Sequence, residues 1–348
     1  MTFRSRGSMT ALGATGVIVL CLAWPVAGQA PAAQTATKTR AAAKKSPPRT
    51  PWGAPDLMGV WDFRTLTPLE RPKELAGKQL LTDAEAAQFE QARLAEQETR
   101  DSRPPSDVVG NYNQFWFDPG NKVQGTRRSS LIIDPPDGRV PPLTPEAQKR
   151  EEKIAETRRG LRMHDLTPGG WVEDFGPDGL QVRCIMGFNS GPPMTPGGYN
   201  QNVQLFQTRD HVVILNEMIH NARIVPLDGR PHGNIRQWVG ESRGRWEGDT
   251  LVVDTRNFRR ETSFQRGRTT SNLHLIERFT RVDEDTLRYE FTVNDPTVWT
   301  KPWTAQIDMA KNSEPMYEYA CHEGNYGMYN MLAGARADEA AAAKKGSK

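Results

Sequence analysis

Short runs of β-branched and aromatic residues dominate the chain from Val203 onward, and residues typical of turns separate them. The turn sequences include TRDH, LDGRP, WEGDT and VDEDT. This pattern predicts an antiparallel meander whose short strands close into a barrel or a sandwich. The predicted strands are VQLFQT, HVVILNEM, ARIVPL, RQWVGES, DTLVVDT, HLIERFTRV, LRYEFTV, WTAQIDMA and MYEYACH, with PDLMGVWDF as an earlier first strand.

Two segments ahead of these strands carry the end signals of helices. In LLTDAEAAQFEQARLAEQ, Thr82 stands at the predicted N-cap and Glu85 follows three residues later, which is a capping box. In LTPEAQKREEKIAETRRG, Thr144 is the predicted cap, Pro145 takes the first helical position and Gly160 ends the helix. Both segments are mostly charged with thin apolar stripes, so we expect two surface helices.

The amino-terminal region has the pattern of an export signal followed by a linker. Residues 1–30 combine a basic start, an apolar run and small residues before a predicted cleavage point. Residues 31–50 contain five basic residues and no acidic one, which is typical of a disordered linker. Residues 51–335 then form one β domain with helical insertions, and residues 336–348 a disordered tail. We expect a periplasmic or secreted protein without a membrane span.

The charge balance narrows the expected partners. The whole chain has a net charge of +3, and the basic linker accounts for more than this excess. The remainder is close to neutral, which argues against a protein that binds nucleic acid. A small molecule is the expected partner, no cofactor is predicted, and the oligomeric state is left open.

Two cysteines, Cys184 and Cys321, remain after the predicted signal is removed. In an exported protein such a pair predicts a disulfide, because oxidising compartments favour its formation. The bond would tie the last predicted strand to the loop that precedes the meander.

The motif GVW before a run of hairpins resembles the Gly-x-Trp start of lipocalins, and the EGDTLVV hairpin is similar to those of the wider calycin barrels. Through the motifs PDLMGVW, GRWEGDTLVVDT and EYACHEGNYG, the chain also resembles a group of uncharacterised exported proteins of soil bacteria. The resemblance implies a lipocalin-like antiparallel meander barrel and export. It implies no reaction.

Polar residues gather where the HVVILNEMIHNARIV segment bends. Glu217, His220, Asn221 and Arg223 lie within seven positions and could line a barrel mouth, where they would bind a carboxylate or move a proton. A polar hairpin with a structural ion pair explains the same residues.

The stretch YEYACHEGNYG places a cysteine, a histidine and a glutamate side by side. If it is a strand, Tyr319 and Cys321 share one face, His322 lies on the other, and Glu323 points away from His322. Three interpretations stay open: a disulfide with a polar rim, proton transfer by His322, and a metal site. Known spacing motifs for metal ligands are absent from the sequence, and no metal is predicted.

Three other polar positions have structural explanations that compete with chemical ones. Ser242 occupies the nucleophile position of GESRG, but a hairpin follows where a hydrolase needs a helix. Asp254 interrupts a valine run, so it either lies at a solvent edge or pairs with an arginine. Glu277 is expected in a cross-strand ion pair on the wet face.

These patterns favour an exported protein that binds an apolar or aromatic small molecule in a barrel cavity, with Arg223, Asn221, Trp246, Trp238, Tyr319 and Glu323 as candidate contacts. The alternative is a barrel enzyme of lyase, isomerase or hydrolase type. Its general base would be His322 or His220, with Glu217 or Glu323 as the partner. A third possibility is a structural protein of the cell envelope.

Overall fold

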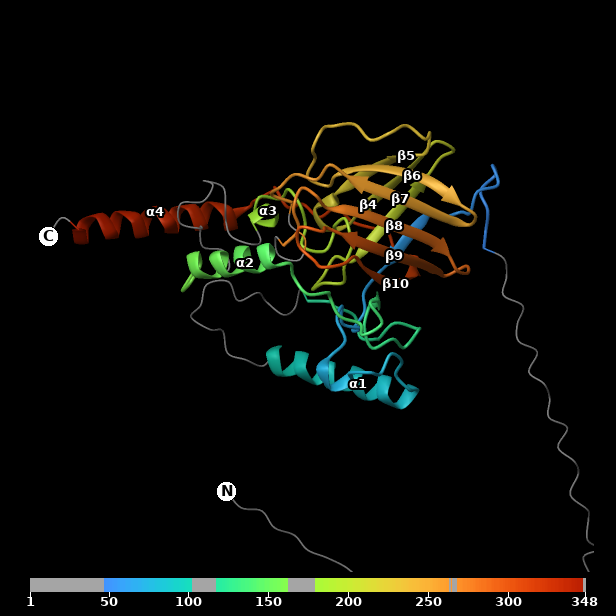
Figure 1. The fold of residues 1–348 in the computed structure, drawn as a ribbon, viewed down its shortest axis with the longest axis horizontal. Helices are drawn as coiled ribbons and strands as arrows, with labels where there is room; N and C mark the ends of the chain where they lie inside the picture. Colours follow the sequence, from blue (N-terminus) through green and yellow to red (C-terminus); the bar gives the residue numbers. More distant parts are fainter. Residues whose placement is uncertain (1–46, 102–116, 162–178, 263, 265–267, 347–348) are drawn as a thin grey trace, which may run out of the picture. The chain divides into compact units, whose positions relative to one another are not determined.

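The computed structural model describes residues 47–101, 117–161, 179–262, 264 and 268–346 (Figure 1). The predicted signal peptide and most of the predicted linker lie outside these residues. Ten strands form one sheet in the order β5-β4-β3-β1-β10-β9-β8-β7-β6, with β2 beside β10. Their bounds are β1 Gly59–Asp62, β2 Ile132–Asp134, β3 Asn202–Gln207, β4 His211–Asn216, β5 Ala222–Pro226, β6 Glu241–Glu247, β7 Thr250–Arg256, β8 His274–Arg281, β9 Thr286–Asn294 and β10 Trp303–Asn312.

All pairings between these strands are antiparallel, as the hairpin pattern predicts. Buried and half-buried positions alternate along the strands because successive side chains point to opposite faces. The hairpin between β6 and β7 turns at Gly248, whose φ of 60° lies in the left-handed region that favours glycine. The meander is therefore confirmed.

The inner face of the sheet is packed with large side chains. Trp61, Phe279, Tyr289, Phe291 and Trp303 are all buried there. The ring of Tyr289 has its centroid 4.9 Å from that of Phe279 and 5.5 Å from that of Phe291. The interior is consequently a core of native-like packing, whereas a ligand-binding barrel would hold an open cup there.

The two edge strands, β5 and β6, lie next to each other without a backbone ladder (Figure 1). The predicted closure into a barrel is thus not confirmed, because no backbone hydrogen bonds join β5 to β6 and a seam remains between them.

Side chains of β5 and β6 pack closely across this seam. A Cβ added at Gly244 of β6 would lie 2.8 Å from Cγ1 of Val225 on β5 and 2.5 Å from Cδ2 of Leu227. Glycine at position 244 allows this approach.

Both predicted surface helices are present. In α1 (Asp83–Asp101) the Thr82 backbone N–H donates to the Glu85 carboxylate at 2.9 Å, and Glu85 N–H donates back to the Thr82 hydroxyl at 3.3 Å. In α2 (Pro145–Thr157) the Thr144 hydroxyl accepts from the Ala147 N–H at 3.2 Å. The caps are satisfied as the sequence predicts. The short elements are α3 (Gly179–Val182) and the 3-10 turns η1 (Lys73–Leu75) and η4 (Met218–His220).

The carboxyl-terminal region differs from the prediction in two ways. MYEYACH is not a strand, and residues 313–325 carry no regular structure. Most of the predicted disordered tail belongs instead to α4 (Tyr326–Gly346), whose alanines favour helix. No helix among the described residues is long and apolar enough to cross a membrane.

Candidate functional site

A buried ion pair crosses the interior near the seam. Arg223 on β5 donates from Nη1 and Nη2 to the two carboxylate oxygens of Glu277 on β8, at 2.7 and 2.8 Å. The Tyr289 hydroxyl donates to the same carboxylate at 2.8 Å and accepts from the Met194 N–H at 3.1 Å. All three side chains are buried. The prediction that Glu277 lies on the wet face is wrong, because the sheet turns that face inward.

Electrostatics in this network follow from burial and proximity. Burial alone would lower the pKa of Arg223, but the charge and hydrogen bonds of Glu277 outweigh it and raise that pKa. Burial and the negative charge of Glu277 raise the pKa of the Tyr289 hydroxyl well above its ordinary value. The Arg223 guanidinium and the Tyr289 hydroxyl therefore keep their protons. The network has a structural role, because it links β5 to β8 through the interior.

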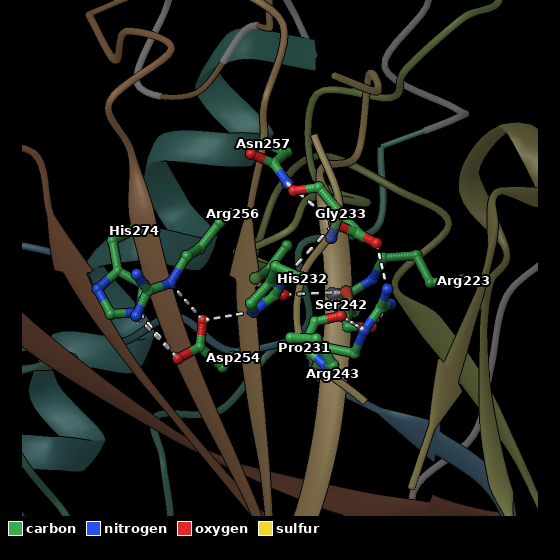
Figure 2. Close-up of polar contacts among 12 residues, drawn as sticks. Arg223, Pro231, His232, Gly233, Ser242, Arg243, Asp254, Arg256, Asn257 and His274 are labelled. Atoms are coloured by element: carbon green, nitrogen blue, oxygen red, sulfur yellow. Dashed lines mark hydrogen bonds and ion pairs between the residues drawn. The ribbon is translucent and has the colours of Figure 1, made fainter. Parts of the chain in front are cut away.

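Ser242 belongs to this network and does not have the surroundings of a nucleophile. Its hydroxyl shares a 2.9 Å hydrogen bond with Thr255. It also lies 3.4 Å from Arg223 Nη1 (Figure 2). The residue is buried in β6, and its hydrogen-bond partners among the described residues include no histidine that would take its proton. The hairpin interpretation of GESRG is consistent with this placement.

A second polar cluster lies on the outer side of β6, β7 and β8, where one carboxylate bridges two imidazole rings (Figure 2). Asp254 Oδ1 is 3.1 Å from His232 Nε2, and its Oδ2 is 3.1 Å from His274 Nε2. Arg256 donates to Asp254 at 3.0 Å. Of the two alternatives for Asp254, the structure shows pairing with an arginine, and the two histidines are contacts that sequence reasoning missed.

Both carboxylates of this outer cluster have lowered pKa values. Burial works to raise the pKa of Asp254, but hydrogen bonds from His274 and Arg256 hold it well below its usual range. Burial likewise opposes ionisation of Glu241, and hydrogen bonds from Asn257 and the Gly233 N–H more than compensate, so its pKa is lowered. Both groups are anions at neutral pH.

This cluster anchors the connection between β5 and β6, residues 227–240, which we call the strap. His232 on the strap bonds Asp254, the Gly233 N–H donates to Glu241 at 2.8 Å, and Asn257 Nδ2 donates to the Gly233 carbonyl at 2.9 Å. Arg243 Nε also donates to the Pro231 carbonyl at 3.2 Å. Since β5 and β6 run in the same direction, the strap must return along the sheet, and these bonds hold it on β6 and β7.

A cavity of about 500 Å³ is lined by α1 and by the segments that contain residues 65–69, 117–119, 131 and 195–198. Its apolar lining includes Leu66, Leu69, Phe117 and Leu131. Its polar lining comes partly from α1, through Arg93, Glu96 and Gln97, and partly from threonines 65, 67 and 195. Residues 195–198 close it on the side of the loop that precedes β3. The cavity has the size and the mixed lining of a small-molecule site.

The predicted catalytic residues are placed near the disulfide but have other partners. Glu217 accepts from the Asn202 side chain at 2.8 Å, while the ring Nδ1 of His220 lies 3.0 Å from the Tyr319 carbonyl. His322 and Glu323 are exposed in the segment without regular structure, so strand alternation does not set the directions of their side chains.

The predicted ligand contacts are distributed over several parts of the molecule. Arg223 is in the buried ion pair, and Trp246 packs against the main core. The Trp238 ring lies under the guanidinium of Arg259, 4.3 Å from its Cζ. Tyr319 packs against the smaller cluster that contains Cys184. None of these residues, nor Asn221 or Glu323, lines the cavity beside α1.

The predicted disulfide is present between Cys184 and Cys321, whose Cα atoms are 5.8 Å apart. Met218 and Ile219 of η4 pack beside it. Asn325 donates to the Val182 carbonyl at 2.9 Å, which adds a polar tie at the same place. The bond thus joins the segment after β10 to the region around α3 and η4.

No group of three histidine, cysteine or acidic side chains within the described ranges is arranged to hold a metal ion. Comparisons with protein-family models, with curated proteins and with solved structures find no match for this chain.

Proposed function

We propose that the protein is an exported binding protein for a small, largely apolar molecule, which it takes up in the cavity beside α1. The observation that carries this proposal is the cavity itself, because about 500 Å³ is within the range that encloses small ligands. The disulfide supports export, since such bonds persist in oxidising compartments. The proposed site differs from the expected barrel cup, whose place is filled by core side chains.

The lining favours a molecule with an apolar body and few polar groups. Phe117, Leu66 and Leu69 offer apolar contact, while Gln97 and the Arg93–Glu96 pair on α1 offer hydrogen bonds at one wall. Nη1 of Arg93 lies 2.9 Å from Oε2 of Glu96, so the two charges neutralise each other. The lining residues therefore do not favour a charged ligand. An uncharged aromatic compound would satisfy both parts of the lining.

A fluorescent probe tests the proposal directly. N-phenyl-1-naphthylamine should bind the wild type with increased emission, and Leu69→Trp should abolish this response by filling the cavity. Ile224→Trp is the control, because Ile224 is 67% exposed on β5 and does not line the cavity. Thermal unfolding of each variant verifies that it is folded. Equal probe binding by the wild type and Leu69→Trp would refute the site.

The second candidate is acid–base catalysis, and the observation that favours it is the Asp254–His274 contact. Nε2 of His274 donates a hydrogen bond to the Asp254 carboxylate. In a neutral ring with this tautomer, Nδ1 carries no proton and can accept one from a substrate. His274 is half-buried, so a substrate can reach it. Hydrolysis of p-nitrophenyl acetate should then fall in His274→Gln and be unchanged in His211→Gln. Equal rates in both variants would exclude this role.

A further inference from the structure

We propose a second binding site under the loop of residues 187–201, at the end of the sheet where β4 finishes and β5 begins. We call it the asparagine site and define it by Asn189, Asn216, Asn221 and Arg223. Its ligand is a small, uncharged, hydroxyl-bearing molecule of the polyol class. None of the four residues lines the cavity beside α1, so this site stands independently of the function proposed above.

The first support is a concentration of buried polar atoms that have no hydrogen-bond partner among the described residues. Asn216 is 1% exposed, and neither its Oδ1 nor its Nδ2 makes a hydrogen bond. The same holds for Oδ1 of Asn189, Nδ2 of Asn221 and Nε of Arg223. Leaving such an atom unpaired costs about 1–3 kcal/mol, so native proteins hold few of them. Four of these five atoms belong to residues at the adjoining ends of β4 and β5, and we infer from this concentration a site built for polar contacts.

Strand register brings three of these residues together. Arg223 pairs with Ile214, and Asn216 follows Ile214 by two positions on the same inward face. The Asn216 N–H donates to the Asn221 carbonyl at 2.9 Å, so those two residues are in direct contact.

Asn189 approaches from the overlying loop. Its Nδ2 donates to the Tyr199 carbonyl at 2.9 Å and lies 3.3 Å from that of Asn200. The chain then enters β3, where Val203 pairs with Asn216. These bonds hold Asn189 beside the residues that lead into β3, the strand that pairs with β4, and we infer that it completes the asparagine site from there.

The second support is independent of the side chains and concerns the backbone. Ile219 has a φ of 58° and His220 a φ of 39°, and both lie between Asn216 and Asn221. Asn200, whose carbonyl Asn189 contacts, has a φ of 50°, which asparagine adopts more readily than β-branched residues do. A β-branched residue in the left-handed region is a genuine outlier, and each strained residue costs about 1–3 kcal/mol. A strained backbone persists only where the surrounding structure enforces it. Such residues cluster at binding sites, where functional groups are held in fixed positions.

The available atoms determine the class of ligand. Nδ2 of Asn216, Nδ2 of Asn221 and Nε of Arg223 are donors, while Oδ1 of Asn216 and Oδ1 of Asn189 are acceptors. Glu277 already neutralises Arg223, so a charged ligand would be buried without a counter-charge. A hydroxyl group both donates and accepts, and several hydroxyls on a short chain match this mixture of atoms.

Saturation-transfer NMR with meso-erythritol tests the asparagine site on the full-length protein. The wild type should transfer saturation to erythritol, and Asn216→Leu, which keeps the side-chain volume, should weaken the affinity at least about tenfold through the loss of two hydrogen bonds. Asn221→Ala is the second variant and should weaken it in the same direction. The control is Thr269→Val, which removes a buried hydroxyl without a partner from the connection between β7 and β8.

Circular dichroism confirms that each variant is folded before the NMR comparison. A site that holds only water gives no erythritol signal in the wild type, and this outcome overturns the proposal. Affinity that is unchanged in either asparagine variant, or weakened equally in Thr269→Val, also overturns it. Failure of the naphthylamine probe to bind leaves this test unaffected, because the two experiments report on different residues.

Discussion

Arg223 on β5 and Glu277 on β8 form a two-point ion pair through the sheet interior, although β4, β3, β1, β10 and β9 stand between them in the strand order. The pair therefore connects one edge strand with the opposite side of the curled sheet. The ion pair links the two sides of the seam, where β5 and β6 form no backbone ladder.

Breaking this pair should strongly destabilise the fold. Glu277→Gln leaves the buried Arg223 charge without a counter-charge, and we expect the free energy of unfolding to fall by about 3–5 kcal/mol. Urea unfolding followed by tryptophan fluorescence measures the change. The matched control is Arg278→Gln, one residue further on the outer face, where the exposed pair with Glu247 contributes at most about 1 kcal/mol. Similar losses in both variants would contradict the bracing role.

Acid should loosen the strap. The pKa values of Asp254 and Glu241 are lowered in the folded protein, so their contribution to stability is complete above the pKa values of the unfolded chain and declines as the pH falls toward the folded values. Hydrogen exchange of the strap amides should therefore accelerate, relative to intrinsic rates, below about pH 4. In Asp254→Asn the strap should already be less protected at neutral pH and respond less to acid. Asp249→Asn, at the exposed tip of the β6–β7 hairpin, should behave as the wild type.

Removal of the disulfide should lower the free energy of unfolding, because the unfolded chain gains conformational entropy when the bond is absent. The bond closes a loop of 137 positions, for which chain-entropy estimates give about 5 kcal/mol as an upper figure. The double variant Cys184→Ala and Cys321→Ala should lose about 2–5 kcal/mol in denaturant unfolding. Mass measurement of the wild type with and without reductant should show a difference of two hydrogen atoms. Two free thiols in the unreduced protein would disprove the bond.

The seam should tolerate no extra volume at Gly244. Gly244→Ala introduces a Cβ that overlaps Val225 and Leu227, and overpacking of this kind costs about 1–3 kcal/mol. Thermal unfolding measures the loss. Gly125→Ala is the comparison, because nothing lies within 4 Å of a Cβ at that position. Equal melting temperatures for the two variants would show that β5 and β6 are not in tight contact.

Local features of this protein follow from its sequence because they depend on neighbours along the chain. Thr82 with Glu85, Thr144 with Pro145, and Gly248 at its turn each act within a few residues, and all are found as predicted. Strand alternation is local for the same reason. It shows which residues share a face, but not which face is inside, and Glu277 was assigned to the wrong side for that reason.

The clusters that matter for function depend on strand order and register, which the sequence does not encode locally. His232, Asp254 and His274 belong to the strap, β7 and β8, and only the pairing of β7 with β8 and the return of the strap bring them together. The sequence determined the meander, the caps and the cysteine pair. Tertiary structure alone decided that the seam stays open, that the interior is filled, and that a cavity forms beside α1, because each results from contacts between segments far apart in the chain.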